Sequence, residues 1–284
     1  MVVDAKLAGL RRRIEGLEAA GPGRLGEGAR AALGLGHADV DQHFGVGGLL
    51  WGSHQLGGTV GDALSARTFG LMLLSRFLAA QPRARALVVQ EASALRETGG
   101  LYGPGLHALG LDPGRLVIVQ TADGAGALRA INDALRAKTS DILLAELGDG
   151  AGLADLSVTR RFNLAAQQAR VLVLLTTPDL SATSAALTRW RVAAAPSDGR
   201  KRRLGAPTLM LDLVRNRHGR TGRWILQWNS HDRAFSSVPL DRAGIVLRPG
   251  PAVAAPVVSA AGDRPGDARA GAAGLAPGPY RQAG

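Results

Sequence analysis

The chain has 284 residues, enough for one large domain or two small ones, and carries a formal net charge of +11. It has no cysteine, which excludes disulfides, thiolate metal sites and cysteine nucleophiles. The positive charge favours a polyanionic neighbour, of which nucleic acid is the usual one, but a GC-rich genome also favours Arg, Ala and Gly.

The beginning of the chain predicts a short helix and a linker. Residues 4–20 have apolar side chains at helical spacing, with Asp4 placed to cap the helix and Gly21-Pro22-Gly23 to end it. These apolar side chains are Leu7, Leu10, Ile14 and Leu17. Residues 1–13 are charged and lack an apolar signal core, and no run of about 18 apolar residues follows. We therefore expect residues 1–31 to be a helix and linker, and the protein to be cytoplasmic with no membrane partner.

The central part of the chain predicts alternating strands and helices. Short apolar runs occur at 86–90, 116–120, 142–144 and 171–176. Amphipathic helical patterns lie beside them at 63–80, 124–136 and 156–170. Such alternation is typical of βαβ units and of a mostly parallel, buried sheet. The predicted fold class is therefore α/β.

The last part of the chain changes pattern. Leu recurs at every second position over 209–214, and Trp or Leu does so over 224–228. This period of two predicts an antiparallel β-hairpin at the edge of the sheet. Residues 245–247 are a candidate for one more strand. Residues 249–284 are rich in Ala, Gly and Pro without periodicity, so they are predicted to be a disordered tail.

A glycine-rich turn precedes the helix at 63–80, where a nucleotide-binding α/β domain has its phosphate loop. Its residues are Gly57, Gly58, Thr59, Gly61 and Asp62. A working loop needs a Lys to neutralise the phosphates, but no Lys lies between Lys6 and Lys138. Asp62 is placed to cap the helix with its carboxylate, and it would repel a phosphate. We therefore expect no nucleotide cofactor and no catalytic residue in this loop.

Other candidate sites are weaker. Glu146 ends an apolar strand where an ATPase would hold Mg²⁺, and Glu91 takes the place of a water-activating acid, but one acid does not make a site. His37 and His43 lie six residues apart in a polar segment and are interpreted as surface residues rather than metal ligands. We therefore expect no metal.

Two basic clusters are candidate binding surfaces. Arg200, Lys201, Arg202 and Arg203 form a run in a polar loop, and the hairpin carries Arg215, Arg217, Arg220 and Arg223. Exposed arginines contact phosphates without reading base sequence, but they also fit an acidic protein surface. Both interpretations stay open at this point. Trp224 and Trp228 share a face with Leu226, so we expect them to pack rather than to stack on bases.

Residues 36–230 resemble RecA-type ATPases. The resemblance rests on Gly36–Asp41, on the turn Gly45–Gly52, and on Asp141–Glu146 in place of the Walker-B strand. The hairpin sequence R-N-R-x-G-x-x-G-R-W, from Arg215 to Trp224, is similar to that of the ImuA family. The resemblance implies a RecA-like domain over 32–248 with a degenerate phosphate loop.

The resemblance also implies a function. ImuA-type proteins are non-catalytic accessory proteins of SOS-induced translesion DNA synthesis. They work with an ImuB-type Y-family polymerase homologue and a second DnaE-type polymerase, so DNA, RecA and the nucleoid are further expected partners. Two alternatives remain: a nucleotide-binding RecA/KaiC-like ATPase with a non-standard loop, and a SulA-like cell-division inhibitor.

Overall fold

The computed structural model describes residues 31–58, 61–148, 156–178, 180–197 and 205–238. Several sequence predictions fall outside these residues and stay predictions. They are the helix at 4–20, the strand at 245–247, the tail at 249–284, the cluster Arg200–Arg203, and Thr59 of the glycine loop.

Nine strands form one sheet within the described residues, in the order β3-β2-β4-β5-β1-β6-β7-β8-β9. The strands are β1 (Gly52–Gly57), β2 (Ala86–Glu91), β3 (Leu116–Thr121), β4 (Ile142–Glu146), β5 (Leu172–Thr177), β6 (Thr188–Ala194), β7 (Thr208–Asn216), β8 (Gly222–Asn229) and β9 (Ala234–Ser237). All pairings from β3 to β6 are parallel, and those from β6 to β9 are antiparallel. The predicted α/β class, with a mostly parallel sheet and an antiparallel C-terminal hairpin, is confirmed.

The helices are α2 (Ala38–Asp41), α3 (Ala63–Ala80), α4 (Ala92–Thr98), α5 (Gly103–Ala108), α6 (Gly124–Ala137) and α7 (Leu156–Ala169), with a 3₁₀ turn at Pro113–Arg115. The three longest helices match the predicted ranges within one residue. The short helices α2, α4 and α5 were not predicted, because four to seven residues are too few to show a helical period.

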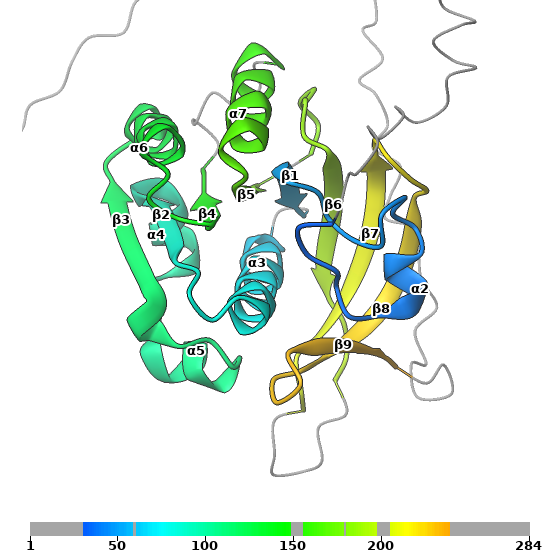
Figure 1. Cartoon of the computed structure of the whole chain (residues 1–284). Coiled ribbons are helices and arrows are strands. Elements are labelled where there is room, and N and C mark those ends of the chain that lie inside the picture. The colour runs from blue at the N-terminus through cyan, green and yellow to red at the C-terminus, as the bar shows by residue number, and fades with distance from the viewer. Residues whose placement is uncertain (1–30, 59–60, 149–155, 179, 198–204, 239–284) are drawn as a thin grey trace, which may run out of the picture. The chain divides into compact units, whose positions relative to one another are not determined.

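Helices cover both faces of the parallel strands (Figure 1). On one face α3 packs on a core that includes Phe69, Met72 and Trp190, while α6 and α7 cover the other face around Ile131 and Phe162. The strands β2, β4 and β5 are buried at every position, which explains their apolar runs. Strand β1 is equally buried but carries Ser53, His54 and Gln55.

Helix α3 is the centre of the larger core. It is long and apolar enough to cross a membrane by length and composition, with a mean hydropathy of 1.2 over 18 residues. However, 61% of this segment is buried inside the domain, as for the core helix of a globular fold. Its apolar surface is therefore used in packing against the sheet.

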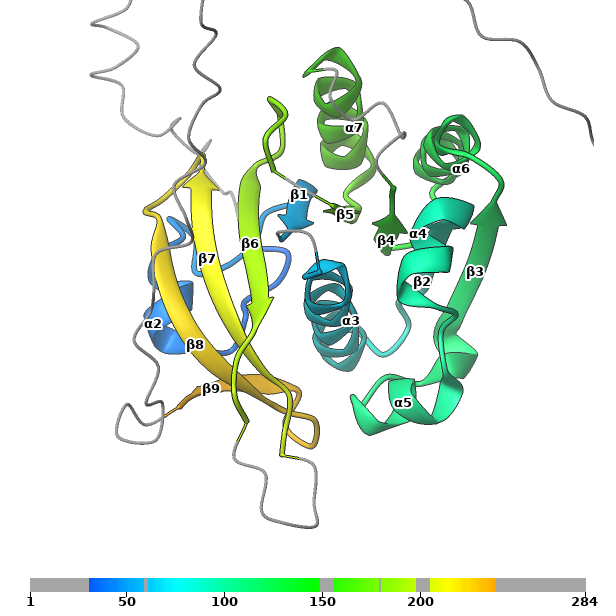
Figure 2. The same cartoon turned by 180° about the vertical axis from the view of Figure 1, so that it is seen from behind.

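The antiparallel strands are covered differently. Leu209, Leu211 and Leu213 of β7 face the core shared with α3, while Met210 and Asp212 point to the other face. No helix covers that second face of β6, β7 and β8 in the described part of the chain (Figure 2). Alternation in β7 therefore reflects one buried and one open face, as the sequence predicted.

Candidate functional site

The parallel register brings Gly57 and Glu146, the residues of the predicted phosphate site, to the carboxyl ends of neighbouring strands. Gly57 at the end of β1 is paired with Thr177, Glu146 at the end of β4 is paired with Thr176, and Gln90 of β2 is paired with Glu146. In open α/β sheets, ligands bind outside the carboxyl ends of the strands. The two residues that the sequence analysis singled out, Gly57 and Glu146, therefore both lie at the carboxyl ends of parallel strands.

Gly58, in the loop that follows β1, is closely surrounded by other atoms. A Cβ atom on Gly58 would lie 2.3 Å from Cβ of Asp62 and 3.0 Å from the carbonyl oxygen of Val192, so no larger residue fits without movement. Gly61 has a φ of 98°, a conformation that suits glycine. The glycines of this loop therefore have a structural reason that involves no phosphate.

Asp62 lies at the N-terminus of α3 but does not cap it as predicted. Its side chain makes no capping hydrogen bond, and its backbone carbonyl instead accepts from the N–H groups of Ser65 and Ala66, at 2.9 and 3.0 Å. The backbone of Asp62, at φ −96° and ψ 2°, is not in the extended conformation from which a side chain folds back on the first turn. The predicted carboxylate cap is wrong for this reason.

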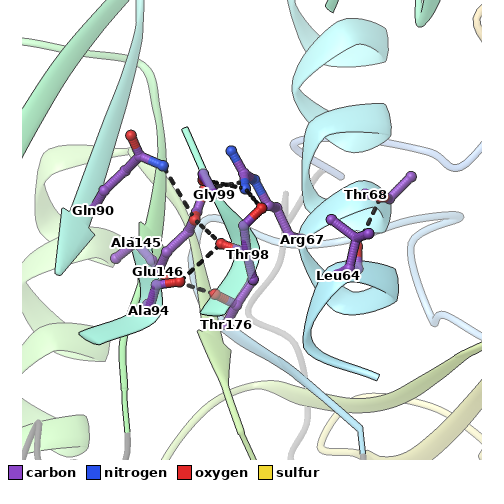
Figure 3. A network of polar contacts seen from close by, with 10 residues as sticks. All are labelled: Leu64, Arg67, Thr68, Gln90, Ala94, Thr98, Gly99, Ala145, Glu146 and Thr176. Atoms are coloured by element: carbon purple, nitrogen blue, oxygen red, sulfur yellow. Dashed lines mark hydrogen bonds and ion pairs between the residues drawn. The ribbon is translucent and has the colours of Figure 1, made fainter. Parts of the chain in front are cut away.

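A buried ion pair lies at the carboxyl end of β4, where the sequence analysis considered Glu146 as a Mg²⁺ ligand (Figure 3). Nε of Arg67, on the second turn of α3, lies 3.2 Å from Oε1 of Glu146, and the side chains are 5% and 2% exposed. Nη1 of Arg67 also donates to the carbonyl oxygens of Thr98 and Gly99, at 2.9 and 2.8 Å. The guanidinium therefore joins α3 to β4 and to the end of α4.

The second carboxylate oxygen of Glu146 is also held. Gln90 Nε2 donates to Oε2 at 3.3 Å, and the hydroxyl of Thr98 donates to the same oxygen at 3.5 Å. Burial raises the pKa of Glu146, while the charge of Arg67 and these two hydrogen bonds oppose the rise. Beside the pair is a cavity of about 20 Å³, which has room for about one water molecule.

Glu91, the other acid at this edge, has a structural role. Its Oε1 accepts from the hydroxyl of Ser93 at 2.7 Å, and its Oε2 accepts from the backbone N–H of Gly148 at 2.8 Å. Both oxygens therefore serve the turns that follow β2 and β4.

The sequence analysis named neither Arg67 nor His54. His54 is fully buried in β1, where its Nε2–H donates to the carbonyl of Leu50 at 2.9 Å and its Nδ1 lies 2.8 Å from the hydroxyl of Thr188. Trp190 Nε1 donates to the same hydroxyl at 2.9 Å. Burial lowers the pKa of His54 to about 4. For Arg67, a charged residue inside the apolar pattern of α3 was the one available signal. His54 lies between Ser53 and Gln55, so no such signal exists for it.

The predicted basic hairpin is formed, but its arginines differ in their surroundings. Arg223 on β8 and Arg191 on β6 share Oδ2 of Asp212, at 2.7 and 3.4 Å, so an acid already balances part of their charge. Arg215 on β7 donates from Nη1 to the carbonyl of Ser184 at 2.8 Å. Arg217 and Arg220 lie in the turn between β7 and β8.

The histidines and tryptophans singled out in the sequence make contacts within the domain. His43 Nδ1 is 2.8 Å from the carbonyl of Asp39, and His37 Nε2 is 2.7 Å from the hydroxyl of Ser237. Within the described ranges, no group of three or more possible metal ligands was found. Trp228 is buried and donates to the carbonyl of Leu109 at 3.1 Å, and Trp224 packs against the core, so the packing role predicted for both is confirmed.

The comparisons with known proteins agree with the predicted resemblance. Protein ImuA of Caulobacter vibrioides, strains NA1000/CB15N and ATCC 19089, is 34% identical over 140 residues, which cover 45% of this chain and 56% of the relative. The resemblance to the ImuA family is confirmed over this segment. The match spans about half the length of these curated ImuA proteins.

Other comparisons add less. No protein-family model matches the chain. The crystal structure of a KaiC-like protein from Pyrococcus horikoshii OT3 covers 74% of this chain with 15% sequence identity and a TM-score of 0.47. The fold assignment therefore rests on the sheet order and pairing described above.

Proposed function

We propose that this chain is a non-catalytic, ImuA-type accessory protein of SOS-induced translesion DNA synthesis. Its role would be to hold an ImuB-type Y-family polymerase homologue and a second DnaE-type polymerase in one complex. The segment that resembles ImuA supports the family context. The closed phosphate site supports the non-catalytic part of the proposal.

The closed site is the observation that carries the proposal. Phosphate binding in this fold requires backbone N–H groups, a Lys and a metal ion held by an acid. Here the acid, Glu146, is paired with Arg67 of the same domain, and the space beside the pair holds about one water. A nucleotide phosphate would have to displace Arg67 from Glu146 and from two backbone carbonyls. We therefore expect ATP to be neither bound nor hydrolysed.

The edge strand β3 supports a role in partner binding. Within the described residues β3 pairs only with β2, so one row of its backbone groups is available. Val117 and Ile118 of β3 are 58% and 45% exposed. An edge strand with exposed apolar side chains favours the addition of a strand from another chain. We expect a segment of a polymerase partner to bind there.

A complementation experiment tests the proposal. In a bacterium that lacks the corresponding gene, the wild-type chain should restore damage-induced mutagenesis and should copurify with the ImuB-type partner. Val117→Lys with Ile118→Lys should lose both properties. The matched control is Leu164→Lys on α7, which also places a charge at an apolar position that is 50% exposed. Restored mutagenesis without any polymerase partner would argue against the scaffold.

The alternative function, an ATPase, has its own test. Mg-ATP hydrolysis that depends on Glu146 would favour the ATPase with a non-standard loop. No observation within the described residues favours the SulA-like alternative.

A further inference from the structure

Residues 184–187 lie between α7 and the β7–β8 hairpin and contact both of them. The N–H of Ala185 donates to the hydroxyl of Thr159 on α7 at 3.0 Å. From the other side, Arg215 Nη1 donates to the carbonyl of Ser184 at 2.8 Å, and the N–H of Arg217 donates to the carbonyl of Leu187 at 3.0 Å. This short segment therefore brings the hairpin next to α7, where Arg160 follows Thr159.

Among these arginines, Arg217 has surroundings that are unfavourable for its positive charge. Its Nε is buried and has no hydrogen-bond partner in the described part of the chain. Burial lowers the pKa of Arg217, and the charges of Arg215 and Arg160 lower it further. All three influences act against the positive charge, and a buried donor without a partner is unfavourable. Arg223 and Arg191 differ, because they share Asp212.

We propose that Arg160, Arg215 and Arg217 form a binding site for a backbone phosphate of nucleic acid. A phosphate would offset the repulsion that Arg215 and Arg160 exert on Arg217. Guanidinium groups bind phosphate oxygens through paired N–H donors, and such contacts do not depend on base sequence. The formal net charge of +11 favours nucleic acid over a single acidic peptide segment.

The site is separate from the closed nucleotide site and does not rest on the polymerase proposal. The N–H of Leu187 donates to the carbonyl of Ser53 at 2.8 Å, which places the segment at the amino end of β1. The phosphate-loop position follows Gly57, at the carboxyl end of the same strand. Arg160 could not be assigned from sequence, because it comes from α7 and not from the basic hairpin.

The test measures the salt dependence of DNA binding by the full-length protein. A labelled single-stranded oligonucleotide is titrated at several salt concentrations, and binding is followed by fluorescence anisotropy. Each lost phosphate contact lowers the slope of log affinity against log salt by about 0.7. Arg160→Gln and Arg217→Gln should each lose part of this slope and bind several-fold more weakly. The double variant should lose the whole contact, which lowers the slope by about 0.7.

Two further variants test whether DNA binding depends on this site or on positive charge in general. Arg161→Gln removes the same charge from the next, exposed residue of α7 and should keep the wild-type slope. Arg160→Lys keeps the charge and should also keep the slope. Arg160 is exposed, so Arg160→Gln is expected to melt as the wild type does.

Three results would overturn the proposal. The first is a wild-type slope in the double variant. The second is an equal loss of slope in Arg161→Gln, which would show that general charge and not this site binds DNA. The third is loss of binding to a polyglutamate probe with unchanged DNA binding, which would make the cluster an acidic-protein site.

Discussion

Nε of Arg67 and Oε1 of Glu146 lie 3.2 Å apart in the interior of the domain, between the core helix α3 and the end of β4. A buried ion pair rarely adds much stability, because removing both charges from water costs as much as their attraction returns. Removing one partner, however, leaves a buried charge unbalanced. The pair is therefore better understood as filling a site than as stabilising the fold.

Glu146→Gln should destabilise the protein by about 3 kcal/mol, because Arg67 then keeps its charge without a counter-ion. Urea unfolding followed by circular dichroism measures this change in the free energy of unfolding. Glu97→Gln is the matched control, since Glu97 lines the rim of the same cavity but is exposed, and it should change stability by less than about 0.5 kcal/mol. Equal stability of the two variants would show that Arg67 does not depend on Glu146.

Acid should destabilise the protein through His54. Its pKa is about 4 in the folded chain and near 6.5 in the unfolded chain, so the unfolded state binds the proton first. The stability contributed by neutral His54 is complete above pH 6.5, falls as the pH falls below that value, and is lost near pH 4. The total loss is about 3 kcal/mol.

Unfolding measurements at pH 7.5 and 5 on the wild type and on His54→Gln isolate this effect. Glutamine keeps a polar side chain but does not titrate, so the variant should have a smaller loss of stability in acid. Glu146 works in the other direction, because its raised pKa favours the folded state as the pH falls. The same acid loss in the variant and the wild type would contradict the role given to His54.

Gly58→Ala should destabilise the protein by about 1–3 kcal/mol, because the added Cβ would overlap with Asp62 and approach the carbonyl of Val192. Gly100→Ala is the control, since a Cβ there meets no atom within 4 Å. Thermal melting of both variants measures the difference. If Gly58→Ala melts with the wild type, the β1–α3 loop is looser than described.

The sequence predicted strands β2 to β5, the β7–β8 hairpin and the three long helices, because their patterns are local. It did not predict β1, β6 or β9, and polar side chains interrupt the apolar pattern of β1 and β6. The 18 residues of α3 and the alternation over Leu209, Leu211 and Leu213 can each be read from one short segment. The position of Glu146 at the carboxyl edge followed in the same way, from an apolar run that ends in an acid.

The contacts that define the site are not local. Arg67 and Glu146 are distant in sequence, and only the parallel pairing of β4 with β2 and β5 brings Glu146 beneath α3. Thr159 of α7, beside Arg160, and Arg215 of the hairpin are joined through residues 184–187, which no local pattern reveals.

The central claim is that Arg67 and Glu146 close the phosphate site. Isothermal titration of the folded, full-length protein with Mg-ATP tests it most directly. We predict no measurable heat of binding and no release of phosphate on longer incubation. A dissociation constant in the low micromolar range would contradict the claim, since a nucleotide could then displace Arg67 from Glu146.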